Sequence, residues 1–259
     1  MSSYIFDVET DGFLDVVSKV HCIVLKDVDT NTMIHLPVEE AVAKLEKADL
    51  IIGHNIIKYD IPVLQKLYGF DFKNKILDTI VATRLLFPDV KEKDFQRKDF
   101  PRDCIGRHSL KAWGNRIGNY KAQFETDWKT YSPEMLDYCT QDVEVTYNLW
   151  KMIEQKGYSQ QAMDLEHEVS LLIFKQESYG FSFDTDGAKQ LYSKLQSRRL
   201  ELEDELQNLF PPKTLKTPFI PKVNNKARGY VKGETFYKEK IVTFNPSSRH
   251  HIADRLSEM

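Results

Sequence analysis

Tyr4-Ile5-Phe6-Asp7-Val8-Glu9 is the stretch from which the fold prediction starts: a short apolar run, predicted to be a β-strand ending at Asp7, leads into two acids. In a strand, residues two apart point to the same face, so the carboxylates of Asp7 and Glu9 can reach one point in space. Two carboxylates aimed at one point repel each other unless a cation lies between them, and ligands that are all oxygen suit Mg²⁺ or Mn²⁺. Taken alone, the pair is more commonly surface charge. Asp-x-Glu also recurs at residues 142–144 and 164–166, in predicted helices where the two side chains diverge.

A third acid, Asp60, closes the stretch Asn55-Ile56-Ile57-Lys58-Tyr59-Asp60. The apolar run over 50–53 predicts a buried strand just before it, and a helix is predicted over 59–68. An acid at the start of a helix is commonly only a partner of the helix dipole, so the meaning of Asp60 depends on its neighbours in space.

A fourth acid lies in a later predicted helix. Ser132-Pro133 is a typical helix start, and the helix is predicted to run from there to near Ile153. Tyr138 and Asp142 are four residues apart in this helix and therefore share one face. By itself this pair is explained by a core tyrosine whose hydroxyl donates to a nearby carboxylate.

The order of the predicted elements indicates the fold class. Three early strand candidates, 4–6, 20–25 and 33–36, predict an antiparallel meander, and 50–53 adds a strand between helical patterns. Strands first with helices interleaved later indicate a mixed α/β domain over 1–156, followed by a helical connector over 157–210 and a basic segment over 211–259. Further helices are predicted over 39–48, 59–68, 78–86, 109–116 and 163–177, an irregular surface loop over 88–107, and a long helix after Asp184 with an apolar stripe of Leu191, Leu195, Leu202, Leu206 and Leu209.

Charge is unevenly distributed along the 259 residues. The net charge is −3, yet residues 211–246 carry eight Lys or Arg against two Glu, which leaves −9 for the rest. Such a run is usually a solvated face, and the alternative is a segment that contacts phosphates. An acidic remainder would repel a nucleic acid unless metal ions neutralise its carboxylates.

Bulk properties exclude a membrane protein and a disulfide-stapled secreted one. No apolar run approaches the ~18 residues that a membrane span needs, and the N-terminus lacks the pattern of a secretory signal. Three widely spaced cysteines, Cys22, Cys104 and Cys139, predict reduced thiols and a cytoplasmic setting.

Together, the three acidic motifs resemble the signature of the four-carboxylate 3′→5′ exonuclease superfamily, in its tyrosine-bearing branch. The chain is similar to the proofreading exonuclease domain of family-A DNA polymerases, and more narrowly to the replicative polymerases of short-tailed phages. The further similarity lies in Ser18-Lys19-Val20-His21-Cys22, Gly53-His54-Asn55 with Lys58-Tyr59-Asp60-Ile61-Pro62, His108-Ser109-Leu110-Lys111-Ala112-Trp113-Gly114, Lys175-Gln176-Glu177 with Gly180-Phe181-Ser182-Phe183-Asp184-Thr185, and Phe244-Asn245-Pro246-Ser247-Ser248-Arg249.

This resemblance implies a ribonuclease H-like exonuclease fold and hydrolysis at DNA 3′ ends with two divalent ions, Mg²⁺ or Mn²⁺. By position in the motifs, Asp7 is expected to bridge both ions. Glu9 and Asp142 are expected to hold the ion that activates water, and Asp60 the other. The Tyr138 hydroxyl is expected to orient the attacking water.

Four further residues are candidates for contact with the DNA strand. Thr10 is placed to touch the terminal nucleotide, and Phe13 is spaced to stack against the last bases, with ordinary core packing as the alternative. Asn55 either bonds the strand or only shapes its turn, and Lys58 is a candidate phosphate contact. The expected substrate is a single-stranded or frayed 3′ end.

In the resembled family, the last two of these motifs, which begin at Lys175 and Phe244, belong to the start of the polymerase part, and the segment 211–259 resembles the start of its thumb. A polymerase module, in the same or a separate chain, is therefore the expected partner. Two other functions stay open from the sequence. One is an RNA-trimming exonuclease, because the metals act on phosphate in either nucleic acid. The other is a docking module of a replication complex without activity.

Overall fold

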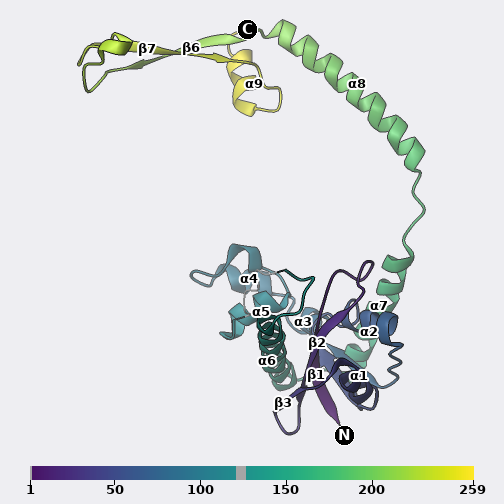
Figure 1. The fold of residues 1–259 in the computed structure, drawn as a ribbon. Coiled ribbons are helices and arrows are strands. Elements are labelled where there is room, and N and C mark those ends of the chain that lie inside the picture. The colour runs from purple at the N-terminus through teal and green to yellow at the C-terminus, as the bar shows by residue number, and fades with distance from the viewer. Residues whose placement is uncertain (1, 121–126) are drawn as a thin grey trace. The chain divides into compact units, whose positions relative to one another are not determined.

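The computed structural model describes residues 2–120 and 127–259, which form two compact units, 1–180 and 181–259 (Figure 1). The first unit is built on a five-stranded sheet of order β3-β2-β1-β4-β5. Its strands are β1 (Ser3–Thr10), β2 (Val20–Asp27), β3 (Thr32–His35), β4 (Leu50–Gly53) and β5 (Lys75–Asp78). The first three strands are antiparallel, and β4 and β5 run parallel to β1. The expected mixed α/β architecture, with antiparallel first strands in the sheet and helices around it, is confirmed.

The first strand extends beyond its predicted end at Asp7. β2 pairs with β1 along its whole length, from Tyr4 opposite Asp27 to Thr10 opposite Val20. This pairing keeps the chain extended through Glu9, so both acids lie within the strand and on one face.

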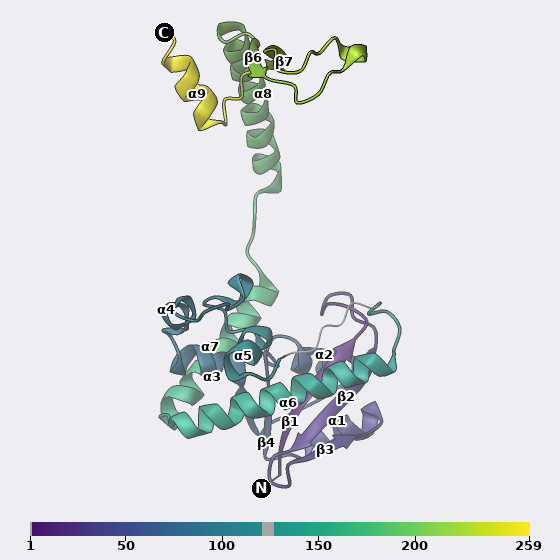
Figure 2. The ribbon, with the colours of Figure 1, turned by 90° about the vertical axis from the view of Figure 1, so that its left-hand side faces the viewer.

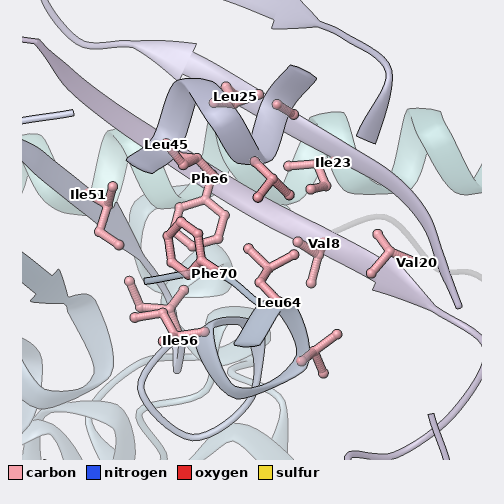
Figure 3. Close-up of a cluster of buried hydrophobic side chains, with 14 of the residues drawn as sticks. Phe6, Val8, Val20, Ile23, Leu25, Leu45, Ile51, Ile56, Leu64 and Phe70 are labelled. Atoms are coloured by element: carbon pink, nitrogen blue, oxygen red, sulfur yellow. The ribbon is translucent and has the colours of Figure 1, made fainter. Parts of the chain in front are cut away.

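Helices cover both faces of the sheet because neighbouring strand residues point in opposite directions. Phe6 faces a core shared with α1 (Val38–Glu46) and α2 (Asp60–Tyr68), where Leu45 and Leu64 pack beside it (Figure 3). Ile5 faces the second core, which α3 (Thr79–Leu86), α5 (Leu110–Ile117) and α6 (Pro133–Lys156) cover. The long α6 lies across β1 and β2 on that face (Figure 2).

The stretch 88–107, predicted as an irregular surface loop, contains α4 (Val90–Phe95) and a short 3₁₀ turn, η1 (Arg102–Cys104). Asp94 is buried there and accepts hydrogen bonds from Arg116 Nη2 at 2.8 Å and from the Gly106 amide at 3.0 Å. The prediction of an irregular loop is wrong because this buried ion pair organises the segment around α5, which a scan for apolar periodicity does not detect.

α7 (Gln160–Tyr179) was expected in the connector, yet it packs on the first unit. Met163 and His167 are its buried residues, and His167 contacts the end of β5. The chain therefore divides into its two units after Gly180, whereas the expected domain boundary was at residue 156.

The second unit contains α8 (Thr185–Leu209), a hairpin of β6 (Lys213–Phe219) and β7 (Phe236–Val242), the 3₁₀ turn η2 (Lys226–Arg228) and α9 (Arg249–Leu256). The hairpin was missed, since its residues are mostly exposed and show no alternation of apolar and polar residues. The structure describes all of α8, and none of its residues is buried. In its leucine stripe, Leu206 is half-buried and the other four leucines, Leu191, Leu195, Leu202 and Leu209, are exposed. Among the described residues, no helix is long and apolar enough to cross a membrane.

Candidate active site

The two acids of β1 open the site. Asp7 is half-buried and Glu9 buried, and an oxygen of each lies within 4.8 Å of the other and of Cys139 Sγ. Burial raises the pKa of the Cys139 thiol well above its usual value, and the hydrogen bond with Cys22 and the nearby Asp7 charge act in the same direction. Cys139 therefore stays protonated and donates to the Asp7 carbonyl oxygen at 3.4 Å. The available ligands at this point are carboxylate oxygens.

Asp60 joins these acids through the backbone of β1. β4 pairs with β1 only over Ser3 to Ile5, so β4 accepts no hydrogen bond from the later amides of β1. The Val8 amide donates to Asp60 Oδ1 at 3.2 Å. Because Asp60 is the first residue of α2, the helix start places its buried carboxylate beside the strand acids.

α6 brings in the last pair. The Ser132 side chain accepts a hydrogen bond from the Met135 amide, so the helix begins as predicted, with Pro133 in its first turn. Tyr138 and the buried Asp142 then lie one turn apart, facing the sheet. A cavity of about 190 Å³ is lined by Asp7, Val8, Glu9, His54, Asn55, Tyr59, Asp60, Trp128, Tyr138 and Asp142.

The structure thus brings all four predicted acids and Tyr138 to one cavity. Three of the acids, Glu9, Asp60 and Asp142, are buried, and grouping buried carboxylates is costly without a compensating cation. An all-oxygen set of this kind fits hard divalent ions such as Mg²⁺ or Mn²⁺.

Four residues were predicted to contact the DNA strand, and of these only Asn55 lines the cavity. It has a left-handed backbone, with φ of +67°. Thr10 is buried: its hydroxyl donates to the Gly12 carbonyl oxygen at 3.0 Å and contacts the Tyr59 hydroxyl. Lys58 forms an ion pair with Glu177.

The remaining candidate, Phe13, is 80% exposed on the turn that follows β1. This exposure removes the alternative that it is an ordinary packed core residue. The backbone of this turn is closed by hydrogen bonds from the Val16 and Val17 amides to the Phe13 carbonyl oxygen. Phe13 does not line the cavity, so any contact with a strand would occur outside it.

Trp128 lines the cavity and was not singled out from the sequence. Its ring stands edge-on to Tyr138, with centroids 5.8 Å apart, and its carbonyl oxygen accepts a hydrogen bond from His21 Nε2 at 2.9 Å. A single aromatic outside any periodic pattern carries no signal in the sequence, so the contact with Tyr138 is visible only in the fold.

Tyr59 and His54 also line the cavity and had been given no role. Burial, with the charges of Asp60 and Glu9, raises the pKa of Tyr59, so its hydroxyl stays protonated and donates to the Gly12 carbonyl oxygen at 2.6 Å. Both residues lie inside the Gly53–Pro62 motif, which was the available signal.

The chain was compared with protein families, with curated proteins and with solved structures. No family model matches the chain. The DNA-directed DNA polymerases of Escherichia phage T7 and Enterobacteria phage T3 are each 30% identical to it over 97% of the chain and 49% of the polymerase, so the chain spans about half the length of the curated relatives it matches. Among solved structures, Brucella melitensis NrnC with bound Mg²⁺ is 20% identical over 67% of this chain and 80% of its own, with a TM-score of 0.43. The chain is thus a homologue of the DNA-directed DNA polymerases of these phages.

Proposed function

We propose that this chain is a divalent-metal-dependent 3′→5′ exonuclease that removes nucleotides from DNA 3′ ends. The observation that carries the proposal is the convergence of four carboxylates and a tyrosine, from three distant parts of the chain, on one small cavity. Side chains of this kind, partly buried and aimed at one point, serve to bind cations that act on a phosphate.

Each residue has a role within this proposal. Asp7 would hold both ions, Glu9 and Asp142 would hold one of them, and Asp60 would hold the other. When bound, the ions supply an activated water and stabilise the departing 3′ oxygen. The Tyr138 hydroxyl orients the attacking water, and Trp128, edge-on to Tyr138, limits the position of that ring.

The substrate class rests on the homology. The carboxylates act on the phosphate group and do not separate DNA from RNA. Similarity to phage DNA polymerases over 97% of the chain supports DNA, and a proofreading role beside a polymerase. The same homology and the free cysteines support the host cytoplasm as the setting.

The partner is a polymerase module. The chain spans about half the length of its relatives, and the residues that line the cavity belong to the first unit. Each unit has exposed apolar side chains suited to such a partner: the exposed leucines of α8 on the second unit, and Leu165 and Leu172 of α7 on the first. By itself the chain is expected to incorporate no nucleotides.

The test uses the purified 259-residue chain with a 5′-labelled single-stranded DNA and the matched RNA. Mg²⁺ should support stepwise shortening of the DNA from its 3′ end, chelator should stop it, and the RNA should be cut more slowly. Faster cutting of the RNA would favour the RNA-trimming alternative. Absence of metal-dependent hydrolysis would leave the docking alternative, and extension of a primer on a template would contradict the expected need for a separate polymerase module.

A further inference from the structure

A further acidic residue, Asp78, lies outside the cavity yet holds one of its walls. It is 1% exposed, at the end of β5, and caps α3 by accepting a hydrogen bond from the Ile80 amide at 3.0 Å. A cap requires only that contact. The same carboxylate also accepts from the Asn55 amide at 2.8 Å, through Oδ1, and from the Ile57 amide at 3.1 Å, through Oδ2.

These two extra bonds define the turn that leads into Asp60. Asn55 adopts the left-handed region, with φ of +67°, which is uncommon for a residue with a side chain and needs support from the surrounding structure. The turn supplies one bond of its own, from the Lys58 amide to the Asn55 carbonyl oxygen at 3.2 Å. The inward-pointing amides of Asn55 and Ile57 are satisfied by Asp78, so the path of the chain here depends on that carboxylate.

The turn matters because it carries one side of the cavity. Asn55, which Asp78 binds directly, lines the cavity. So do Tyr59 and Asp60, which follow shortly after Ile57 in the sequence. The next residue, Thr79, makes a parallel contact between its Oγ1 and His54 Nδ1, at 2.8 Å. The junction of β5 and α3 therefore contacts the 54–57 turn at three of its residues, His54, Asn55 and Ile57.

The backbone of Asp78 is also bound by a residue of α7, His167. The Asp78 amide donates to His167 Nε2 at 2.7 Å. His167 Nδ1 then donates to the Met163 carbonyl oxygen at 2.8 Å, which places the proton on Nδ1 and leaves Nε2 as the acceptor. This buried histidine joins α7, expected only to connect domains, to the same structural unit as the cavity.

We propose that Asp78 is a positioning residue for the candidate metal site: it sets the place of Asp60 and Asn55, and His167 holds it in register. The inference rests on the proposed function, since it assigns a consequence for metal binding. Groups that orient metal ligands without touching the metal change affinity or activity by about 10–100-fold when removed. A purely structural aspartate would change stability alone.

Asp94 offers a matched control. It is also a buried aspartate, 1% exposed, that accepts a hydrogen bond from a backbone amide, Gly106, but it neither lines the cavity nor bonds the 54–57 turn. Asp78→Asn and Asp94→Asn are compared for thermal stability, for Mn²⁺ affinity by titration calorimetry, and for hydrolysis of single-stranded DNA. Asn keeps one acceptor oxygen for Asn55 and Ile80, while its NH₂ group faces the Ile57 amide and breaks that link.

Asp78→Asn should weaken Mn²⁺ binding by about tenfold or more and slow hydrolysis by a similar factor, whereas Asp94→Asn should lower the melting temperature and leave Mn²⁺ affinity at the wild-type value. If Asp78→Asn does not fold, Asp78→Ser serves instead, because serine retains the cap of α3 while being too short to hold the turn. Wild-type Mn²⁺ affinity in a folded Asp78 variant, or an equal loss in Asp94→Asn, would overturn the inference. Failure of the wild type to bind Mn²⁺ would instead overturn the proposed function on which it rests.

Discussion

The Val8 amide donates a hydrogen bond to Asp60 Oδ1 at 3.2 Å, tying the residue between the two strand acids to the first residue of α2. Fifty-two positions separate the two residues in the sequence. The bond uses an amide that lies beyond the pairing of β1 with β4. Consequently the carboxylates of Asp7, Glu9 and Asp60 lie close together, although the first two come from a strand and the third from a helix.

Asp7→Ala is expected to abolish hydrolysis, with a loss on the order of 10³-fold or more, since it removes the carboxylate proposed to hold both ions. Single-turnover cleavage of a labelled oligonucleotide measures this. Asp15→Ala, at an exposed position outside the cavity, is the control and should cut normally. Activity of Asp7→Ala within tenfold of the wild type would contradict the assignment.

Tyr138→Phe and Asp142→Ala separate two roles on one helix face. Tyr138→Phe removes a hydroxyl that orients water, which should cost on the order of 10–10²-fold in rate, whereas Asp142→Ala removes a metal ligand and should cost clearly more. Mg²⁺ titrations of both variants provide a second measurement: only Asp142→Ala should shift the concentration that gives half-maximal rate. A larger loss in Tyr138→Phe would reverse the roles.

Single strands and mismatched 3′ ends should be cut faster than paired ends, because fraying costs about 1–2 kcal/mol per base-pair step. Two aromatic side chains are candidates for holding the unpaired bases, Trp128 in the cavity wall and the 80% exposed Phe13 outside it. Stacking is worth about 1–3 kcal/mol per base, so alanine at either position should raise KM for single strands by roughly 5- to 150-fold. Phe95→Ala, at another exposed aromatic, is the control. Equal rates on paired and unpaired ends would argue against strand fraying, and unchanged KM in both variants would rule out both platforms.

His108 predicts a pH dependence of stability. Burial, assisted by the charges of Arg116 and Arg84, lowers its pKa to about 4. The unfolded chain takes up this proton near the ordinary value of about 6.5 while the folded chain does not, so the contribution to stability is present above pH ~6.5 and is lost as pH falls toward 4. His108→Phe, which keeps a ring against Trp113, should flatten that part of the profile.

The measurement is urea unfolding followed by tryptophan fluorescence at pH 4 to 8. All three tryptophans, Trp113, Trp128 and Trp150, lie in the first unit, so the signal reports that unit alone. His35→Gln, at an exposed position, is the control and should retain the slope. A wild-type slope in His108→Phe would refute the prediction.

The basic segment after Pro211 should add salt-sensitive affinity for longer DNA. Each phosphate contact with single strands contributes about 0.7 to the slope of log affinity against log salt, so replacing three lysines should lower the slope by about 2. The variant combines Lys222→Gln, Lys226→Gln and Lys232→Gln, and the control combines Lys47→Gln, Lys73→Gln and Lys98→Gln on the first unit. Hydrolysis of short oligonucleotides should be unchanged in both. An unchanged slope in the first variant would mean that the segment is only a solvated face.

Strand alternation placed Asp7 beside Glu9, and helix spacing placed Tyr138 beside Asp142, because these rules are local. That the two pairs meet was expected only from the resemblance of the three motifs to a known family. The role of Asp60 could not be assigned from local rules, because an acid at the start of a helix commonly only interacts with the helix dipole or caps the helix. Trp128 and the hairpin of the second unit were missed for a different reason. Their positions follow from contacts between distant segments and leave no periodic trace in the sequence.

The same reason explains the domain boundary. α7 looked like part of a connector because its pattern is that of any amphipathic helix. The contact from His167 to the amide of Asp78 assigns it to the first unit, and that contact joins residues 89 positions apart. A buried histidine in a helix gives no indication of which strand end it binds.

The β6–β7 hairpin has a consequence for how the protein behaves in solution. Among the described residues no third strand pairs with it, so both outer edges present backbone groups that another copy could bind. On β7, Lys238 and Lys240 place like charges along the edge, whereas Lys213 and Lys216 on β6 are paired with Glu258 and Glu239, and Pro218 removes one backbone donor from β6. At 1 M salt the screening length falls to about 3 Å, and this mutual repulsion between copies largely disappears. Strand-to-strand aggregation should therefore increase in the high-salt buffers that are ordinarily used to strip nucleic acid from such proteins.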